Sequence, residues 1–211
     1  MEREFKMNAK EYVKNVLITE SRDFTKIQER LSDIRNIRLI HASAGITSEV
    51  AEILELADLS KGMNDLDRIN LMEEMGDILW YVGIAADSLD SVDRIMGPVI
   101  HTAKKLENDH DLADSLTNIG IALATLSGEF ADLAIKKFCF YGKPFDAEPL
   151  VQILINVNAF VDVALVEAGF TIEEARERNI AKLKARYGEK FTEAAALERN
   201  LEAEREILEK K

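Results

Sequence analysis

Apolar positions recur at helical spacing along most of the chain. Between Arg68 and Asp90 they follow one another at steps of three, four and seven, which places them on one face of a helix. The whole pattern predicts helices at residues 8–20, 23–41, 44–60, 67–90, 91–107, 111–138, 147–168 and 172–187. No pair of strands stands out, so we expect an all-α helical bundle.

Short runs rich in glycine, proline or polar residues interrupt this pattern. They predict breaks at residues 61–62, 97–98, 108–111, 141–144 and 169. The final stretch, residues 191–211, has a helix-forming composition but few apolar positions. We expect it to form a helical C-terminal arm.

Two parts of the chain resemble one another. The segment Ser48–Ile53 aligns with Gly128–Leu133, and Leu71–Asp77 aligns with Leu150–Asn156. This similarity predicts two copies of one helical hairpin, at residues 36–108 and 111–190, within a single domain spanning 1–211. Two such copies would pack about a pseudo-two-fold axis. Chance similarity between amphipathic helices is the alternative.

The composition excludes several kinds of protein. The chain has 211 residues, 47% of them apolar, enough for one globular core. Acidic residues outnumber basic ones by 39 to 27, and the formal net charge of −12 would repel a nucleic-acid backbone or an anionic membrane. We therefore expect neither polymeric nucleic acid nor a membrane as a partner.

Sequence signals favour a cytoplasmic location. The single Cys139 excludes an internal disulfide framework and fits a reducing compartment. The first residues are too charged to contain the apolar region of a secretory signal. The most apolar stretch, Leu150–Phe170, carries five polar or acidic residues, so it reads as a buried helix in a soluble protein.

Two pairs of carboxylates form the strongest chemical signal. Glu49 and Glu52 lie three residues apart, as do Glu74 and Asp77, and each pair shares one helix face. Antiparallel packing of their helices would bring four like charges together at the edge of the core, where they need a cation. Oxygen ligands of this kind suit Mg²⁺ or Mn²⁺. A merely solvated helix face is the alternative, but neither pair has a basic residue four positions on.

Longer motifs surround these carboxylates. They are Arg38–Ala42 leading into Gly45–Glu52, then Glu73–Tyr81, the basic loop at 136–144, and Asn179–Tyr187. Together they resemble the MazG-like all-α nucleoside triphosphate pyrophosphohydrolases over most of residues 36–190. Members of that family use Mg²⁺ to cleave (d)NTPs between the α and β phosphates, releasing a monophosphate and pyrophosphate. We expect a homo-oligomer, most simply a dimer formed through apolar surface and the C-terminal arm. The alternative is that the duplicated chain mimics such a dimer by itself.

The resemblance assigns roles to individual residues. It implies that Glu49, Glu52, Glu74 and Asp77 bind the metal, and that one of them also serves as general base. It implies that the phosphates are held by Asn179, Lys182 and Arg186, and that Tyr81 touches the ribose or base. Without the resemblance, Lys182 and Arg186 would read as the flank of an amphipathic helix. Lys136, Lys137 and Lys143 are weaker phosphate-binding candidates.

The second copy departs from the family pattern. It keeps Glu129 and Asp132, but Ile153 and Asn156 stand where Glu74 and Asp77 align. The second copy alone also keeps the basic loop and the C-terminal helix. We therefore expect a division of labour in which the first copy holds metal and the second supplies phosphate-binding cations.

Other interpretations remain open at this point. The substrate could be of the dUTP/dCTP type or that of the related phosphoribosyl-ATP hydrolases. The chain could also be an inactive bundle that binds nucleotides or a protein. Among the remaining residues, we expect Trp80 and Cys139 in the core and His41 buried with a hydrogen-bond partner.

Overall fold

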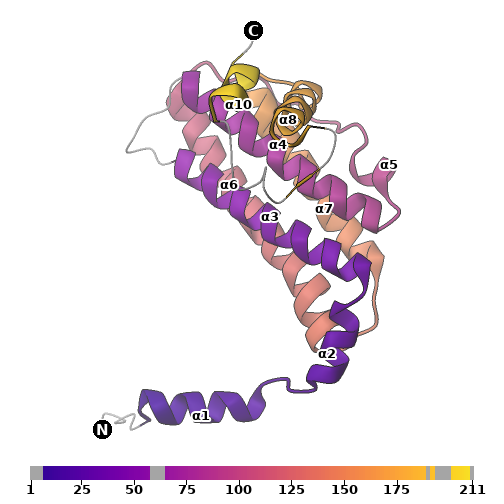
Figure 1. Ribbon diagram of the computed structural model, residues 1–211. Helices are drawn as coiled ribbons and strands as arrows, with labels where there is room; N and C mark the ends of the chain where they lie inside the picture. The colour runs from indigo at the N-terminus through magenta and orange to yellow at the C-terminus, as the bar shows by residue number, and fades with distance from the viewer. Residues whose placement is uncertain (1–6, 58–64, 189–190, 193–200, 210–211) are drawn as a thin grey trace, which may run out of the picture.

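The computed structural model describes residues 7–57, 65–188, 191–192 and 201–209, and within these ranges every regular element is a helix (Figure 1). The all-α prediction is therefore confirmed. The elements are α1 (Ala9–Thr19), α2 (Phe24–Leu31), α3 (Ile34–Leu56), α4 (Asp65–Ser88), α5 (Val92–Ile95), α6 (Asp109–Ala131), the π-helix η1 (Asp132–Phe140), α7 (Ala147–Ala168), α8 (Ile172–Tyr187) and α10 (Leu201–Leu208).

Four long helices enclose the core. Helix α3 packs on α4 and α6, and α7 packs on the same two helices, which closes a four-helix arrangement. Each helix contributes fully buried apolar side chains, among them Ile53, Ile78, Leu116 and Leu154. Helix α8 lies across α4, and α10 lies on α8 at the end of the molecule away from α1 (Figure 1). This stacking of α4, α8 and α10 builds the site described below.

Local capping explains where the helices begin and end. The side chains of Asn108 and Thr171 accept hydrogen bonds from the free N–H groups at the starts of α6 and α8. Helix α7 ends at Gly169, whose φ of 94° is the left-handed conformation that glycine adopts without strain. The predicted helices at 8–20, 67–90, 147–168 and 172–187 are confirmed to within about two residues as α1, α4, α7 and α8.

Two predicted helices have their boundary in the wrong place. The sequence pattern predicted helices at 23–41 and 44–60, but α2 ends at Leu31 and α3 runs without interruption from Ile34 to Leu56. The actual break follows from Asp33, whose side chain accepts a hydrogen bond from the backbone N–H of Arg35 at 2.8 Å and so starts α3. The predicted break at residues 61–62 lies outside the described residues.

The predicted helix at 91–107 is also wrong. Only the single turn of α5 is helical there, and residues 96–108 are irregular. The segment is fixed by other contacts: the N–H of Leu106 donates to the carbonyl of Glu167 at 2.8 Å, and Arg68 donates to the carbonyl of Leu106 at 3.1 Å. His101 Nε2 lies 2.7 Å from Asp162 Oδ2 on α7. These contacts supply the hydrogen bonds that a helix would otherwise provide.

The predicted helix at 111–138 changes type part-way. It begins as α6 and continues as η1 from Asp132 to Phe140, where the helix widens to π geometry. Cys139 in η1 is fully buried, which confirms its predicted place in the core. The predicted helix within 191–211 is found where α10 lies, but α10 packs on α8 and buries Leu208 instead of forming a free arm. The rest of that range is mostly outside the described residues.

Two helical stretches, Asp109–Phe140 and Ala147–Ala168, are long and apolar enough to cross a bilayer, with mean hydropathies of 1.2 and 1.8. In the most apolar 18-residue part of each stretch, 33% of the first and 56% of the second is buried inside the bundle. Helix α7 also carries buried Asn158 and Asp162, which would be costly in lipid. The two stretches are therefore weak evidence for a membrane protein, since core helices share this composition.

Candidate metal and phosphate site

Helices α3 and α4 bring three of the four predicted carboxylates together. Glu49 from α3 and Glu74 and Asp77 from α4 each place one carboxylate oxygen within 4.8 Å of the other two. All three side chains are half-buried. Glu52 lies outside this group of three but lines the same cavity. The spacing of the two acidic motifs thus produces the convergence expected from antiparallel helices.

The cavity beside these carboxylates has a volume of about 300 Å³ and lies between α3, α4 and α8. Its surface has an acidic part and an aromatic part. The acidic part adds Glu73 to the four predicted carboxylates. The aromatic part consists of His41, Trp80, Tyr81, Tyr187 and Phe191. A cavity of this kind can hold a cation at one side and a flat ring at the other.

The acidic side of the cavity carries unfavourable negative charge. Burial raises the pKa of Glu74 to about 9, and repulsion from Glu52, Glu73, Asp77 and Glu49 adds to the effect. Burial and the charges of Asp77 and Glu52 likewise raise the pKa of Glu49. Without a cation, protons therefore neutralise part of this cluster at neutral pH.

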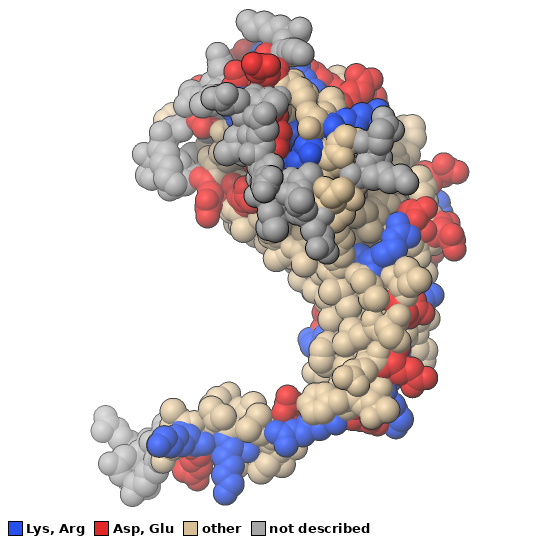
Figure 2. Space-filling model, in the orientation of Figure 1, with Lys and Arg blue, Asp and Glu red and all other residues tan. Residues whose placement is uncertain are grey.

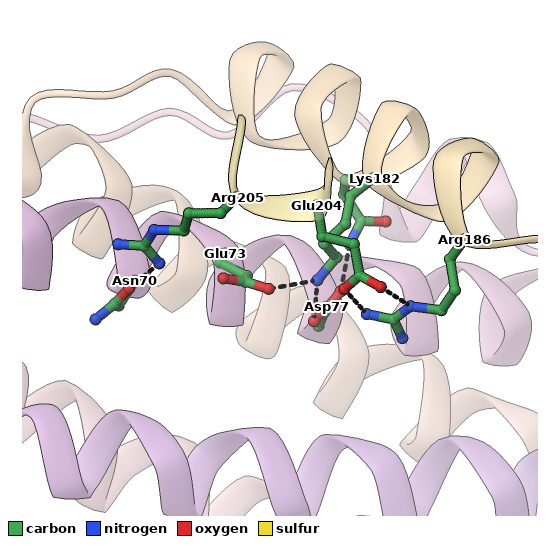
Figure 3. Close-up of polar contacts among 8 residues, drawn as sticks. Asn70, Glu73, Asp77, Lys182, Arg186, Glu204 and Arg205 are labelled. Atoms are coloured by element: carbon green, nitrogen blue, oxygen red, sulfur yellow. Dashed lines mark hydrogen bonds and ion pairs between the residues drawn. The ribbon is translucent and has the colours of Figure 1, made fainter. Parts of the chain in front are cut away.

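Lys182 on α8 is bound beneath the carboxylates. Its side chain is 1% exposed, and Nζ lies 2.5 Å from Asp77 Oδ2 and 3.1 Å from Glu73 Oε1 (Figure 3). Burial acts to lower the pKa of Lys182, but the charges of Asp77 and Glu73 outweigh it and the net pKa is raised. Lys182 is therefore a buried cation that neutralises two carboxylates of α4.

Asn179, one turn earlier on α8, binds the other oxygen of the same carboxylate. Its Nδ2 donates to Asp77 Oδ1 at 2.5 Å. Both oxygens of Asp77 are thus held by α8, which fixes the orientation of this side chain. Neither Asn179 nor Lys182 lines the cavity. This differs from the predicted phosphate grip, because the two residues face Asp77 and position it from behind.

Arg186 does line the cavity, and among the described lining residues it has the only guanidinium or ammonium group. Its Nε donates to Glu204 Oε1 at 2.8 Å and its Nη2 donates to Glu204 Oε2 (Figure 3). The hydrogen bonds to Glu204 raise the pKa of Arg186. Glu204 belongs to α10 and is 3% exposed. No sequence pattern pointed to this partner, because the last segment contains several acidic residues and nothing distinguishes Glu204 among them.

Further contacts hold α10 in place. Arg205 Nη1 donates to Asn70 Oδ1 on α4 at 2.6 Å (Figure 3). Arg178 on α8 donates to the carbonyl of Leu208. The side chain of Leu208 is 2% exposed and joins the core. Helix α10 is therefore bound to both helices that build the site.

Tyr81 lies against α3, at the edge of the carboxylate group. A Cβ atom at Gly45 would come within 2.2 Å of its ring, so only glycine allows the ring to occupy this position. Burial, followed by the charges of Glu49 and Asp77, raises the pKa of Tyr81. The predicted placement of Tyr81 on the carboxylate side agrees with this geometry.

Two aromatic side chains lie elsewhere than the sequence predicted. Trp80 was expected in the core but is 36% exposed, and His41 was expected to be buried but is exposed. Both line the cavity with Tyr81, and the ring centres of Trp80 and Tyr81 are 4.9 Å apart. The three rings meet edge to face.

The basic loop lies away from the acidic cavity. Lys136 and Lys137 both pair with Asp132 on η1, Lys137 at 2.6 Å. Lys137 and Lys143 line a separate cavity of about 240 Å³. The weaker phosphate-binding candidates therefore lie away from the site. The basic residues at the site, Lys182 and Arg186, both come from α8.

Comparison with known proteins gives no match: no protein-family model, curated protein or solved structure corresponds to the chain. The functional conclusion therefore depends on the geometry of the cavity and on the residue patterns that form it.

Proposed function

We propose that this protein is a Mg²⁺-dependent pyrophosphohydrolase of nucleoside triphosphates, with a bundle of the MazG-like type. One observation carries the proposal: Glu49, Glu74 and Asp77 bring carboxylate oxygens within 4.8 Å of one another at the wall of a cavity that also contains an arginine. An acidic cluster alone is common on protein surfaces. Here it is half-buried, faces aromatic rings and is held by a buried lysine.

The donor set fits Mg²⁺ or Mn²⁺. Glu49, Glu74 and Asp77 offer hard oxygen ligands, and burial together with neighbouring carboxylates raises the pKa values of Glu49 and Glu74. These three residues would hold the metal, with Glu52 beside them. When bound, a divalent cation neutralises the triphosphate and lowers the barrier to attack at phosphorus.

The remaining groups of the cavity have distinct tasks in this proposal. Glu52 is exposed and stands outside the group of three, so it is the carboxylate placed to accept the proton of the attacking water. Arg186 now holds the carboxylate of Glu204 through two N–H groups, and a phosphate offers the same bidentate acceptor. Substrate phosphate would replace Glu204 at Arg186.

The aromatic part of the cavity suits the base or sugar of a nucleotide. Tyr81 and Trp80 lie next to the carboxylates, and Tyr187 contacts Phe191 with ring centres 5.1 Å apart. Aromatic faces bind nucleobases by stacking. This arrangement favours a nucleotide over inorganic triphosphate as the substrate.

Two further parts of the interpretation belong with this proposal. The hairpins α3–α4 and α6–α7 fall in the two proposed pseudo-repeats and pack against each other in one bundle, which is compatible with an internal duplication. The acidic composition and the single buried Cys139 support a cytoplasmic protein of nucleotide metabolism.

The test is hydrolysis of a panel of dNTPs and NTPs with and without Mg²⁺, with products separated by chromatography. We expect a nucleoside monophosphate and pyrophosphate in a 1:1 ratio, and no activity in EDTA. Preference for dUTP or dCTP within the panel would assign the related dUTP/dCTP-type activity. A folded protein that binds nucleotides but turns over none would be the inactive binding bundle, and release of a diphosphate and orthophosphate would also refute the proposal.

A further inference from the structure

Apolar surface is concentrated at the N-terminal end of the molecule. Half of the large apolar side chains that the described residues expose lie between Met7 and Ile37. Figure 1 and Figure 2 show α1 projecting clear of the bundle as an arm, whereas α2 and the start of α3 lie at the end of the bundle. Contiguous apolar patches of this kind are sites of protein association in soluble proteins.

Helix α1 presents one apolar face that nothing in its own chain covers. Tyr12, Val13, Val16 and Leu17 are one, three or four residues apart, so they form a continuous stripe, which we call the arm face. All four are more than 40% exposed, and no residue of α1 is buried. A helix of 11 residues is marginal in water unless it packs against a partner. The arm face therefore needs a surface to cover it.

A second uncovered apolar surface lies where the arm joins the bundle. It consists of side chains from α2, α3 and the end of η1, and we call it the bundle-end face: Phe24, Ile34, Ile37, Phe140 and Tyr141. Ile34 is 75% exposed and Tyr141 is 62% exposed. Ser21 Oγ donates to the carbonyl of Phe140 at 3.1 Å, which ties the base of the arm to this end of the bundle. The arm then leads away from it (Figure 1).

We propose that the occupant of both faces is a second copy of this chain. The arm face of each copy would cover the bundle-end face of the other, in a two-fold symmetric, arm-exchanged dimer. Within one chain the two faces do not meet, because the arm leads away from the bundle end (Figure 1). A two-fold axis would create two identical contacts, and in each the arm face of one copy would cover the bundle-end face of the other.

The available area is sufficient for a stable dimer. The nine side chains of the two faces expose roughly 1,000 Å² per copy, so reciprocal burial removes roughly 2,000 Å² from water, within the range of stable interfaces. A membrane surface is the competing occupant of an amphipathic helix.

The first experiment measures the mass of the full chain in solution by light scattering coupled to gel filtration. We expect twice the monomer mass of 23.7 kDa for the wild type. The double variant Val16→Glu, Leu17→Glu should dissociate, with Kd raised about 30-fold or more. Ile100→Glu is the matched control, because Ile100 is 100% exposed outside both faces, and it should remain dimeric. A monomeric wild type, or a dimer unaffected by the double variant, would overturn the proposal.

The second experiment tests the exchange itself. The variant Ile34→Glu, Ile37→Glu damages the bundle-end face, and it should be monomeric like the arm-face variant. Mixing the two variants should restore a heterodimer, because the intact arm of one meets the intact bundle end of the other. Circular dichroism establishes that each variant is folded. If the mixture stays monomeric while both variants are folded, or if the arm binds anionic vesicles and not a second copy, the exchanged dimer is wrong.

Discussion

The two hairpins of the bundle share one core and differ in their chemistry. In α3–α4, Glu49, Glu74 and Asp77 meet at a cavity. In α6–α7 the aligned positions hold Ile153, which is 7% exposed in the core, and Asn156, which is exposed. The second hairpin thus contributes to the core without a matching acidic cluster at these positions.

The difference shows that the acidic site needs a third helix. Helix α8 packs mainly on α4 and supplies Lys182 and Asn179 to the two oxygens of Asp77. In the second hairpin, Asp132 finds its cations on its own helix, because the π geometry of η1 brings Lys136 and Lys137 to the same side. Asp77 is therefore stabilised by a lysine from another helix, whereas Asp132 is stabilised by lysines of its own helix.

Asp77→Asn is the substitution expected to show the largest functional difference between the two hairpins. The substitution removes a charge from the proposed metal ligands but keeps the size of the side chain. We expect kcat/KM for the preferred triphosphate to fall about 100-fold or more, with the helical circular dichroism unchanged. Glu49→Gln should behave in the same way. Activity within a few-fold of wild type for both would show that the acidic cluster is not the reaction site.

Lys182→Met tests whether α8 stabilises the first hairpin. The variant leaves Glu73 and Asp77 facing a buried neutral side chain, and loss of one partner from such a group costs about 3 kcal/mol. We expect Tm to fall by roughly 6–12 °C, since each kcal/mol shifts Tm by about 2–4 °C in a chain of this size. Lys184→Met, an exposed change on the same helix, is the control and should leave Tm unchanged.

Glu74→Gln tests the charge of the cluster through pH. The folded-state pKa of Glu74 is about 9 against an ordinary 4.5, so between these values the folded chain holds a proton that the unfolded chain has released. The associated stability is complete below pH 4.5 and is lost as pH rises toward 9. We expect the Tm of wild type in EDTA to fall between pH 6 and 8.5 by a few degrees more than that of Glu74→Gln.

Added Mg²⁺ provides the internal control for this pH experiment. The cation should replace the proton in the wild type and raise its Tm at pH 8.5, but it should stabilise Glu74→Gln less. Parallel pH profiles for the two proteins in EDTA would show that Glu74 titrates normally and that the cluster is not strained.

The smallest effect is expected from Glu129→Gln in the second hairpin. Glu129 aligns with Glu49 but is exposed and does not line the acidic cavity. Activity should stay within about two-fold of wild type, because surface substitutions of this kind rarely change stability or function. A loss as large as that of Glu49→Gln would mean that both hairpins contribute ligands, and the division of labour would be refuted.

The sequence was sufficient for the helices whose ends carry clear caps. The ranges 147–168 and 172–187 were predicted to the residue, since Asp146, Gly169 and Thr171 mark their ends. It failed at residues 42–43, which separated two predicted helices, although α3 continues through them. The reason is tertiary: Ala42 and Ser43 are buried by packing against the neighbouring helices. Such a contact cannot be read from a local pattern.

The site was predictable to a similar extent. The spacing of Glu49, Glu74 and Asp77 predicted their convergence, because helix periodicity and antiparallel packing determine it. The roles of Lys182 and Arg186 could not be separated from the sequence, although they lie one turn apart. Lys182 points under α4 and is buried, whereas Arg186 reaches the cavity and Glu204. That distinction depends on how α8 crosses α4.

The close approach of Tyr81 to Gly45 limits how this protein can diverge. A methyl group at position 45 would overlap the phenol ring, so a descendant that acquires alanine there must also exchange the tyrosine for something smaller. Glycine in the middle of a helix is less stable than alanine by about 0.5–1 kcal/mol. We therefore expect Gly45 to be retained only while the ring of Tyr81 occupies the adjacent space. Positions 45 and 81 should therefore mutate together in any lineage that descends from this chain.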